Sequence, residues 1–513
     1  MMDAVIGIDI GTYSSKGVVC RADGVVLAEA RIEHGVSIPC AGQMEHDADK
    51  VWWHDFVSVS RRLMGSIPSN TKIAAVGVSA IGPCLLPVDR LGRPLRPAIL
   101  YGADVRASEQ LARLEREYAT GITRLSGTRL TSQAVGPKIL WLRENEPEVF
   151  ARTARFMTST GYMVFRLTGT YGIDHHNASY FAPFYDIRKM RWDLRFAGGD
   201  VAIETLPELC WTSDIVGCVT AEAASQTGIP AGTPVTGGTT DGAAEAVGAG
   251  VLHPGDLMIS YGSTSALVIV ADRFRPVPGL WTTRGARPDE YVLTAALSTS
   301  GSITSWFRKQ FAREFPQTST EETSDVHAQL CREAEASPPG ARGLLLLPYF
   351  SGERSPFNDP LARGVISGLS LSHNRGDVYR AILEATAFGI RHNLEWMAAS
   401  GTRPRRAIAV GGGTASRLWL QIVADVTGLT QEIPDRLIGA AYGDAYLAAA
   451  AIGLPDQATS RNEPWVHTVD RIEPDLCLES MYAGRYELYR ELFRVTRPIV
   501  HALASGTPGD GLS

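Results

Sequence analysis

A loop of small and hydroxyl-bearing residues near the start of the chain could bind a phosphate group. Gly11 leaves an apolar strand, so backbone amides can approach an anion there, while Thr12 and Ser14 offer hydroxyls and Lys16 offers a positive charge. Asp9, one pleat before the turn, could hold Mg²⁺ through water, because Mg²⁺ takes few carboxylates and keeps much of its hydration. For a single loop of this kind, a tight hairpin with solvent-facing hydroxyls is the alternative.

A second loop of the same type follows another apolar strand in the second half of the chain, at Gly262, Ser263 and Thr264. Two such hairpins, one in each half of a duplicated chain, could face each other across a cleft and hold one polyphosphate from both sides. A third loop, the three glycines at 411–413, lies between a strand and a helix and could let a flat base lie against the backbone. A plain strand-to-helix turn is the alternative for that triplet.

Asp241 lies in a glycine-rich stretch between a short apolar strand and a helix of small residues. A carboxylate at such a junction could accept a proton from a hydroxyl and so turn a polyol into a nucleophile. The alternative is that Asp241 only caps the helix that follows. Asp104 and Arg106 form a mixed pair that could hydrogen-bond sugar hydroxyls, with a surface ion pair as the alternative.

The strands that must position these residues are predicted twice over. Each half opens with an apolar strand, a small-polar turn and a second apolar strand, and later has a short apolar strand that ends at a loop of small residues. The predicted strands are residues 4–10, 17–20, 25–27 and 73–79 in the first half, and 257–261, 266–270 and 407–413 in the second. We therefore interpret the chain as one fold used twice, with a boundary near residues 250–254.

Helices alternate with these strands, which is typical of α/β architecture. Apolar residues at a spacing of 3.6 predict helices over 377–400, 415–427, 440–452 and 479–496. We expect a first domain over 1–250, a second over 251–455 and a C-terminal extension with a terminal helix over 456–513.

Composition narrows the class of protein. A length of 513 residues argues for two domains or more, and a net charge of -6 without any block of Lys or Arg argues against a nucleic-acid or polybasic membrane partner. The seven cysteines are an odd number without a C-x-x-C spacing, which disfavours a disulfide framework or a zinc site. No signal peptide or membrane span is evident, so we expect a cytoplasmic protein.

With these pieces in order, the chain resembles the FGGY family of carbohydrate kinases, part of the actin, sugar kinase and Hsp70 superfamily. The resemblance runs from Val5 to about Gly453, and its longest motifs are residues 138–145, 352–360 and 364–384. It implies an α/β fold with two actin-like (ribonuclease H-like) domains, a duplicated βββαβαβα core and a central cleft. It also implies that ATP and Mg²⁺ are used to phosphorylate a hydroxyl of a sugar or polyol.

The resemblance also assigns roles to single residues. Asp241 matches the catalytic base, and Asp9 matches the acid that binds Mg²⁺ through water, with Asp241 beside the metal. The phosphate contacts that it implies are Gly11, Thr12, Ser14, Lys16, Gly262, Ser263 and Thr264, the nucleotide-pocket positions are Gly301 and Ser305, and the adenosine contacts are Gly412 and Ser416. The implied sugar contacts are Ser79, Ala80, Asp104, Arg106 and Asp241.

The identity of the sugar is the open question. Residues 79–84 (SAIGPC) stand where xylulokinases show Gln-Met-His-Gly and glycerol kinases an Arg-Glu pair, and Tyr101-Gly102 replaces the Trp-Asn that precedes the Asp-x-Arg motif of xylulokinases. We expect a ketose, in the first place a pentulose such as xylulose. The alternatives are another sugar or polyol (ribulose, a sugar alcohol) and a non-catalytic actin-like ATP-binding regulator. By analogy with the family the chain could also form a homodimer.

Overall fold

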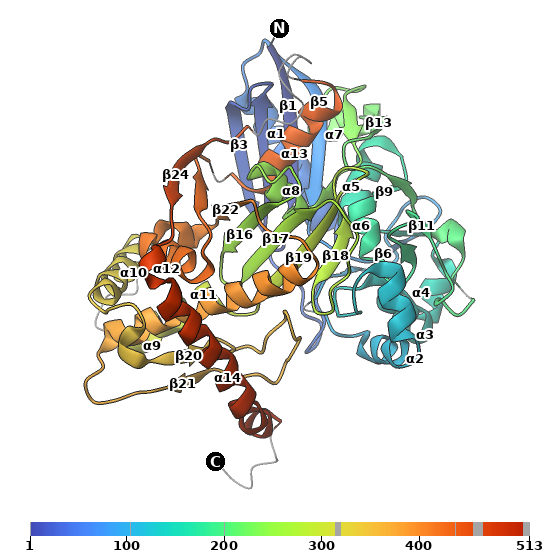
Figure 1. The fold of residues 1–513 in the computed structure, drawn as a ribbon. Helices are drawn as coiled ribbons and strands as arrows, with labels where there is room; N and C mark the ends of the chain where they lie inside the picture. The colour runs from blue at the N-terminus through green and yellow to red at the C-terminus, as the bar shows by residue number, and fades with distance from the viewer. Residues whose placement is uncertain are drawn as a thin grey trace.

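The computed structural model describes residues 2–102, 104–199, 201–312, 320–436, 438–454 and 465–505. The first of its two large sheets has seven strands in the order β13-β14-β5-β1-β2-β3, with β15 also paired to β5 (Figure 1). These strands are β1 Met2–Ile10, β2 Ser14–Arg21, β3 Val26–Glu33, β5 Thr71–Ala80, β13 Ile215–Cys218, β14 Pro234–Thr236 and β15 Thr239–Thr240. The second predicted strand therefore begins three residues before Gly17, because pairing with β1 continues up to the turn.

The second large sheet repeats the plan of the first. Its order is β18-β19-β17-β16-β22-β23-β24, so that β16, like β1, is central, antiparallel to the next strand and parallel to a later one. The strands are β16 Asp256–Tyr261, β17 Ser265–Ala271, β18 Trp281–Arg284, β19 Tyr291–Leu297, β22 Arg406–Val410, β23 Gln431–Pro434 and β24 Thr468–Ile472. The duplicated α/β core expected from the sequence is confirmed.

The remaining strands form two-stranded pieces outside the large sheets. They are β4 Glu45–His46, β6 Leu86–Val88, β7 Ala98–Ile99, β8 Arg155–Met157, β9 Gly172–Asp174, β10 Tyr185–Asp186, β11 Arg191–Trp192, β12 Glu208–Cys210, β20 Leu345–Leu347 and β21 Val365–Ser367. Most of them lie between residues 85 and 211, beside the first sheet (Figure 1).

Helices cover the sheets and connect the strands. In the first half they are α1 His54–Ser66, α2 Ser108–Ser126, α3 Val135–Asn145, α4 Pro147–Arg152, α5 Ser159–Thr168, α6 His175–Ser179, α7 Ala221–Thr227 and α8 Asp241–Gly248. In the second half they are α9 Gly301–Phe311, α10 Thr320–Glu335, α11 Arg375–Ala399, α12 Arg417–Thr427, α13 Ala440–Ala451 and α14 Glu479–Ala504.

The helix ends explain where prediction and structure differ. Asn374 is the N-cap of α11 and forms a capping box with Asp377, so Asp377 is a first-turn acid and the helix begins two residues earlier than expected. The last helix continues to Ala504, eight residues beyond the predicted end at 496, and it includes Pro498. Part of the predicted polar stretch over 456–474, residues 456–464, lies outside the described residues.

Helices α8 and α13 each pack on the sheet of the other half of the chain. Helix α13 buries its alanines against Val5, Val18 and Ala75 of the first sheet, whereas Ala246 of α8 and its C-cap Ala249 pack against strands of the second. This exchange joins the two halves of the chain. It also means that α13, which the sequence boundary assigns to the second domain, completes the core of the first.

Glycines make this exchange sterically feasible. A Cβ at Gly7 or Gly77 would lie 1.9–2.0 Å from backbone oxygens of α13, and one at Gly443 would lie 1.8 Å from the Ala244 carbonyl oxygen of α8. These approaches are shorter than any side chain tolerates, so glycine is required where the two helices and the sheet meet.

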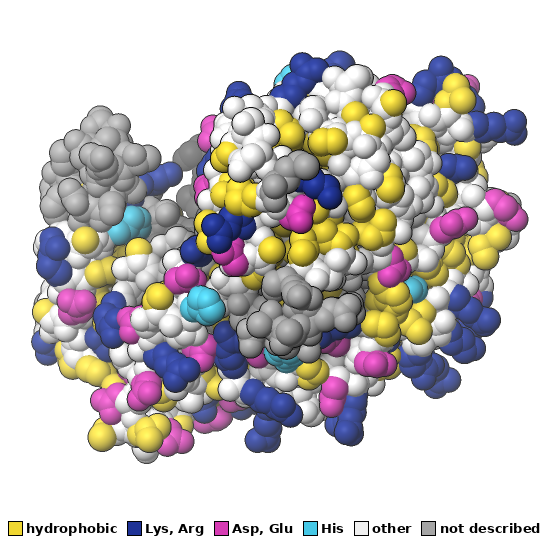
Figure 2. Space-filling model, turned by 90° about the horizontal axis from the view of Figure 1, so that it is seen from above, with side chains coloured by type: hydrophobic (Ala, Val, Ile, Leu, Met, Phe, Trp, Pro, Cys, Tyr) yellow, Lys and Arg dark blue, Asp and Glu magenta, His cyan; other side chains and the backbone are white. Residues whose placement is uncertain are grey.

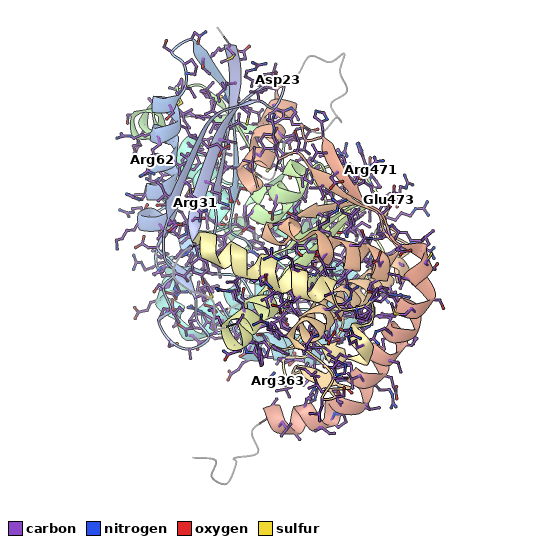
Figure 3. The ribbon with its side chains drawn as sticks, turned by 90° about the vertical axis from the view of Figure 1, so that its left-hand side faces the viewer. Asp23, Arg31, Arg62, Arg363, Arg471 and Glu473 are labelled. Atoms are coloured by element: carbon purple, nitrogen blue, oxygen red, sulfur yellow. The ribbon has the colours of Figure 1, made fainter. Side chains whose placement is uncertain are left out.

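The exterior carries both signs of charge, interspersed on the face shown in Figure 2. On the side shown in Figure 3, Arg62 of α1 reaches across to β3 and donates to the Arg31 carbonyl oxygen at 3.1 Å. Among the described residues, none of the helices combines the length and the apolar character needed to cross a membrane.

Candidate active site

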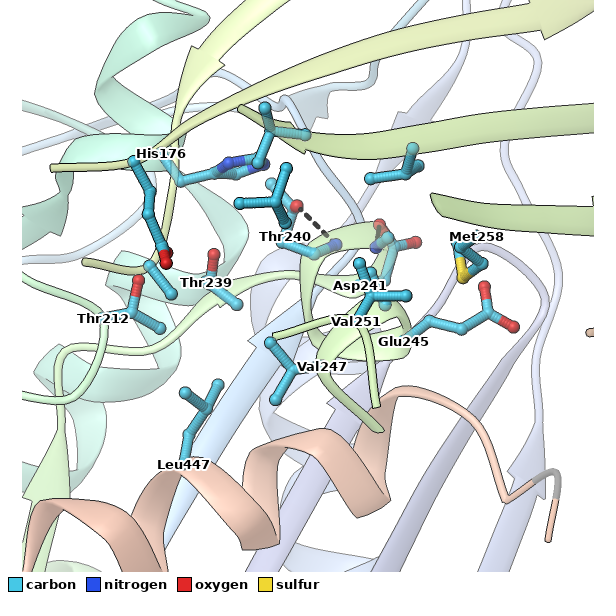
Figure 4. A pocket seen from close by; sticks show the side chains of 18 of the residues that line it. His176, Thr212, Thr239, Thr240, Asp241, Glu245, Val247, Val251, Met258 and Leu447 are labelled. Atoms are coloured by element: carbon cyan, nitrogen blue, oxygen red, sulfur yellow. Dashed lines mark hydrogen bonds between the residues drawn. The ribbon is translucent and has the colours of Figure 1, made fainter. Parts of the chain in front are cut away.

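A cavity of about 460 Å³ lies between α8, α13 and the second sheet. Asp241 lines it, with His176, Thr212 and Thr239 on one side and Glu245 on the other (Figure 4). The rest of the wall is largely apolar and comes from both halves of the chain: Ala246, Val247, Val251, Met258, Ala266, Val268, Val270, Val292, Leu447 and Ala450. A ligand in this cavity would therefore meet the polar side chains near Asp241 and, from the second half of the chain, the charged side chains of Arg287 and Glu290.

Asp241 is the first residue of α8 but does not cap it. The cap is Thr240, whose hydroxyl accepts the Ala243 amide at 3.3 Å, while the Asp241 carboxylate accepts the Gly242 amide at 2.8 Å (Figure 4). The capping alternative from the sequence is therefore wrong. Because β15 pairs in parallel with Ser79 and Ala80 of β5, the carboxylate is held at the end of the first sheet and faces the cavity.

Asp9 belongs to a chain of buried polar groups next to Asp241. The Ser79 hydroxyl lies 3.1 Å from Asp9 Oδ1 and 2.7 Å from Asp444 Oδ2. Burial and the Asp9 charge raise the pKa of Asp444 well above its usual value. A hydroxyl has a single proton, so a protonated Asp444 that donates to Ser79, with Ser79 donating to Asp9, satisfies both contacts.

The site holds more negative charge than positive. Burial, the Asp9 charge and Glu245 raise the pKa of Asp241 to about 8, and burial raises that of Asp9 to about 7 even though Ser79 and Lys16 oppose the change. Burial also raises the pKa of Glu245, against the attraction of Lys16. These carboxyls would release their protons more easily next to an additional cation.

No three His, Cys, Asp or Glu side chains stand close enough to chelate a metal directly, within the part of the chain that the structure describes. The excess of negative charge at Asp9 and Asp241 nevertheless suits a hydrated divalent ion, which needs few direct ligands. The residues present therefore fit a magnesium ion held largely through water.

The first hairpin joins β1 and β2 and places its polar groups near the same acids. The Gly11 amide donates to the Ser14 carbonyl oxygen at 3.1 Å, which closes the turn. Thr12 Oγ1 lies 3.2 Å from the Tyr101 hydroxyl, and Lys16 acts on both Asp9 and Glu245. Gly11, Thr12 and Lys16 thus lie beside Asp9, as the sequence predicts.

The second hairpin is docked on the N-terminus of α9. The Gly301 amide donates to the Gly262 carbonyl oxygen at 2.8 Å, and the Ser302 amide donates to the Ser263 carbonyl oxygen at 3.0 Å. Ser305 follows Gly301 by about one turn on α9. Three residues, Gly262 to Thr264, separate the last paired positions of β16 and β17, against four in the first hairpin, so the two hairpins are similar but not identical.

The glycine loop at 411–413 lies next to the same hairpin. Gly411 has a φ of 94°, and a Cβ there would lie 2.9 Å from the carbonyl oxygen of Tyr261, the last residue of β16. Gly412 begins a short 3₁₀ turn, and Ser416 caps α12 by accepting the Trp419 amide. The structure therefore brings the predicted nucleotide residues of the second half, from three separate segments, to one edge of the second sheet.

Asp104 and Arg106 do not form a surface ion pair, and the sequence alternative is wrong here. Both side chains are buried, and Arg106 binds Asp104 through Nε and Nη2 while its Nη1 donates to Glu45 at 2.8 Å. The Asp104 carboxylate also accepts the Met44 amide at 2.8 Å. Neither side chain is among the residues that line the cavity, so their polar groups hold the surrounding loops together.

Sequence reasoning did not single out several residues that surround Asp241. The Asp241 charge acts on the Tyr101 and Tyr180 hydroxyls, and Tyr180 and His176 line the cavity. Glu245 and Asp444 complete the acidic cluster. Asp444 could have been found as a lone acid in the alanine-rich stretch 440–452, which a buried helix would not otherwise contain.

His176 presents an acceptor to the cavity. Its Nδ1 lies 2.9 Å from the Arg284 carbonyl oxygen, which can only accept, so Nδ1 carries the proton. Burial lowers the pKa of His176, which keeps the ring neutral and leaves Nε2 as an acceptor. A ligand hydroxyl next to His176 would therefore be recognised as a donor.

Comparisons with known proteins agree with this geometry. The model of the N-terminal domain of FGGY carbohydrate kinases matches residues 4–248, and that of the C-terminal domain matches 257–452. The chain is 28% identical to the xylulose kinase of Bacillus subtilis, over 98% of this chain and 99% of that protein. Its fold is similar to that of a xylulose kinase from Rhodospirillum rubrum, with a TM-score of 0.90 and 31% identity over 97% and 100% of the two chains. A kinase from Brucella ovis follows with a TM-score of 0.88, 28% identity and 98% and 100% coverage.

Proposed function

Since the chain belongs to the FGGY family of carbohydrate kinases and is an ATP-dependent sugar kinase, we propose that it phosphorylates a hydroxyl of a pentulose such as xylulose. The observation that carries the proposal is the placement of Asp241. It lies at the start of α8 and lines a cavity beside α13 and the second sheet, and the acids around it include Asp9 and Glu245, on which Lys16 of the first hairpin acts. Xylulose kinases among the relatives support the choice of a pentulose.

Asp241 is the proposed base. Its carboxylate accepts the proton of the attacking hydroxyl, the hydroxyl oxygen bonds to the γ-phosphorus, and the bond from that phosphorus to the ADP oxygen breaks. Burial and the Asp9 charge oppose its ionisation, and a cation beside it favours the ionised form, which is the form that accepts a proton.

The two hairpins and the loop at 411–413 would hold the nucleotide. Thr12, Ser14 and Lys16 would contact the phosphates from one side, and Gly262, Ser263 and Thr264 from the other. The second hairpin is supported by hydrogen bonds to the start of α9, and the loop at 411–413 lies against Tyr261 at the end of β16. The adenosine contacts at Gly412 and Ser416 would follow from that neighbourhood.

Asp9 and Asp241 are the residues proposed to hold Mg²⁺, through water. Burial raises both pKa values, and a neighbouring acid adds to each rise, Glu245 for Asp9 and Asp9 for Asp241, so a cation stabilises their ionised forms. When bound, Mg²⁺ would neutralise charge on the transferred phosphate. Ser79, predicted as a sugar contact, instead bonds to Asp9 and Asp444, so we propose that it orients Asp9.

The sugar would be read by the polar residues that share the cavity with Asp241. The His176 Nε2 acceptor and the Tyr180 ring lie on this wall, together with Thr212 and Gly82 of the 79–84 loop. This set contains a single histidine acceptor and several hydroxyls, which suits a small ketose more than a large glycoside. A cytoplasmic location and a homodimer remain predictions from the sequence.

A coupled assay of ADP release over a panel of ketoses, aldoses and polyols tests the proposal. We expect the highest kcat/KM with a pentulose, and Asp241→Asn to bind ATP while losing turnover by about 10²–10⁴-fold. Asp3→Asn, at an exposed carboxylate at the start of β1, six residues before Asp9, should behave as wild type. A higher kcat/KM with a polyol or hexose would reject the pentulose, and ATP binding without turnover of any acceptor would favour the regulator.

A further inference from the structure

His34 connects the first hairpin to the body of the first sheet. It follows β3, and its Nε2 lies 3.1 Å from the Gly11 carbonyl oxygen while its Nδ1 lies 2.8 Å from Asp55 Oδ2 on α1. The side chains of His34 and Asp55 are 8% and 4% exposed. Ser15 donates its hydroxyl to the same Asp55 oxygen at 2.8 Å. The hairpin is therefore tied at two points to one buried carboxylate.

Both partners of the His34 ring are acceptors. The Gly11 carbonyl can only accept, and Asp55 is ionised: burial opposes its ionisation, but hydrogen bonds from His34, Ser15 and His54 hold its pKa below the usual value. A neutral imidazole has one N–H and can satisfy only one of the two contacts. The arrangement is complete only when both ring nitrogens carry a proton.

The groups around His34 favour the ring with a proton on both nitrogens, and they can be distinguished from His34 itself. Asp55 faces it from α1, with His54 beside Asp55 at 3.3 Å, and His46 of β4 faces it edge-on with ring centres 5.2 Å apart. His46 accepts the Trp52 indole N–H, and burial lowers its pKa to about 4. His46 thus stays neutral across the neutral pH range, and His54 is largely exposed.

The bond to Gly11 fixes the direction of the next amide. A peptide group is planar and trans, so the Gly11 carbonyl and the Thr12 N–H point in opposite directions. When His34 holds the carbonyl on the inner side of the loop, the Thr12 N–H must point away from His34. Thr12 is the residue whose side chain meets Tyr101 beside the acidic cluster.

We propose that His34, charged and held by Asp55, is a positioning residue that aims the Thr12 amide at the phosphates of ATP. The inference rests on the phosphate role proposed above for the first hairpin. Loss of either the His34 charge or its Asp55 partner frees the Gly11–Thr12 peptide to rotate. The affinity for ATP then falls, whereas the sugar site across the cavity is unaffected.

Steady-state kinetics of His34→Gln test the proposal. Glutamine is neutral and cannot bridge both acceptors as the imidazolium does, so we expect the KM for ATP to rise about 3- to 10-fold, with the KM for sugar unchanged. A rise in the KM for ATP without a rise in the KM for sugar distinguishes the positioning of the first hairpin from a general loss of structure.

Two further variants keep the result decisive. His54→Gln removes the other histidine on Asp55 and should retain the wild-type KM for ATP. Asp55→Asn should raise the KM for ATP in the same direction as His34→Gln, and it replaces that variant if His34→Gln fails to fold by circular dichroism. A KM for ATP of His34→Gln or of Asp55→Asn equal to that of wild type, or an equal rise in the KM for sugar, would overturn the proposal.

Lys16→Met separates this inference from the proposed function. If Lys16→Met raises the KM for ATP but His34→Gln does not, the hairpin binds phosphate without help from His34 and the inference is wrong. If Lys16→Met leaves the KM for ATP unchanged, the phosphate role of the hairpin is wrong, and the inference fails with it.

Discussion

Asp241→Asn should stabilise the protein, and the gain should grow with pH. In the folded chain burial, the Asp9 charge and Glu245 raise the pKa of Asp241 from the ordinary 3.8 to about 8. A carboxyl with a raised pKa contributes stability that is present at low pH and is lost as the pH rises through its folded value. Asparagine stays neutral and avoids that loss.

The size of the effect follows from the two pKa values. The difference between 3.8 and about 8 is worth about 6 kcal/mol at ~1.4 kcal/mol per pH unit, and about 4 kcal/mol of it develops between pH 5 and pH 9. Since Asp241 lines a cavity that water can enter, solvent screening reduces the part that develops between pH 5 and pH 9 to about 2–4 kcal/mol. One kcal/mol shifts the Tm of a domain of this size by ~2–4 °C. The amount by which the Tm of Asp241→Asn exceeds that of wild type should therefore be larger at pH 9 than at pH 5 by at least ~4 °C.

Thermal unfolding of wild type and Asp241→Asn at pH 5, 7 and 9, without nucleotide or metal, measures this change. Asp3→Asn removes an exposed carboxylate at the start of β1 and should keep a constant difference in Tm from wild type. If the difference in Tm between Asp241→Asn and wild type is the same at pH 5 and pH 9, the carboxyl is not desolvated among like charges. The electrostatic account of the site would then be wrong.

Two further predictions concern close backbone contacts. Gly443→Ala should lower the free energy of unfolding by about 2–4 kcal/mol in denaturant titrations, because its Cβ would lie 1.8 Å from the Ala244 carbonyl oxygen. The control Gly484→Ala lies on α14 with nothing within 4 Å of its Cβ, and it should raise the free energy of unfolding by up to ~1 kcal/mol. Equal effects of the two substitutions would contradict the packing of α8 on α13. Gly301→Ala places a Cβ 2.6 Å from the Gly262 carbonyl oxygen and should displace the second hairpin. The KM for ATP should then rise several-fold while the KM for sugar stays constant. An unchanged KM for ATP would argue against a phosphate role for that hairpin.

Much of the fold could be read from the sequence because it is written in local patterns. Apolar runs that end in small-polar turns predicted both central hairpins, and the 3.6-residue period predicted α11, α12 and α13 to within two residues. The helix ends were less accurate where a cap decides them, as at Asn374, or where side-chain packing carries α14 past Pro498. The exchange of α8 and α13 between the two sheets has no local signal, since alanines and glycines fit any close contact.

The candidate site, like the fold, could be predicted from the sequence only in part. Residue type and motif position were enough to single out Asp9, Asp241 and the two hairpins, because the chemistry of a phosphate and a proton acceptor requires those groups at turns after strands. Burial and partners were not available from the sequence. The sequence therefore suggested that Asp104 and Arg106 form a surface ion pair, although the two side chains are buried and contact the Met44 amide and Glu45.

The sequence by itself determined the repeat, the family and the residues that meet at the end of each central strand, since these depend on neighbours along the chain. Only the tertiary structure decided which distant groups share one environment. The pKa of Asp241 depends on Asp9, 232 positions earlier, and that of Asp9 on Ser79 and Lys16. The bond from His34 to Gly11 likewise exists only because β3 folds back beside β2 and brings α1 against both. Electrostatic and hydrogen-bond energies depend on distance in space, and packing of the two repeats sets those distances.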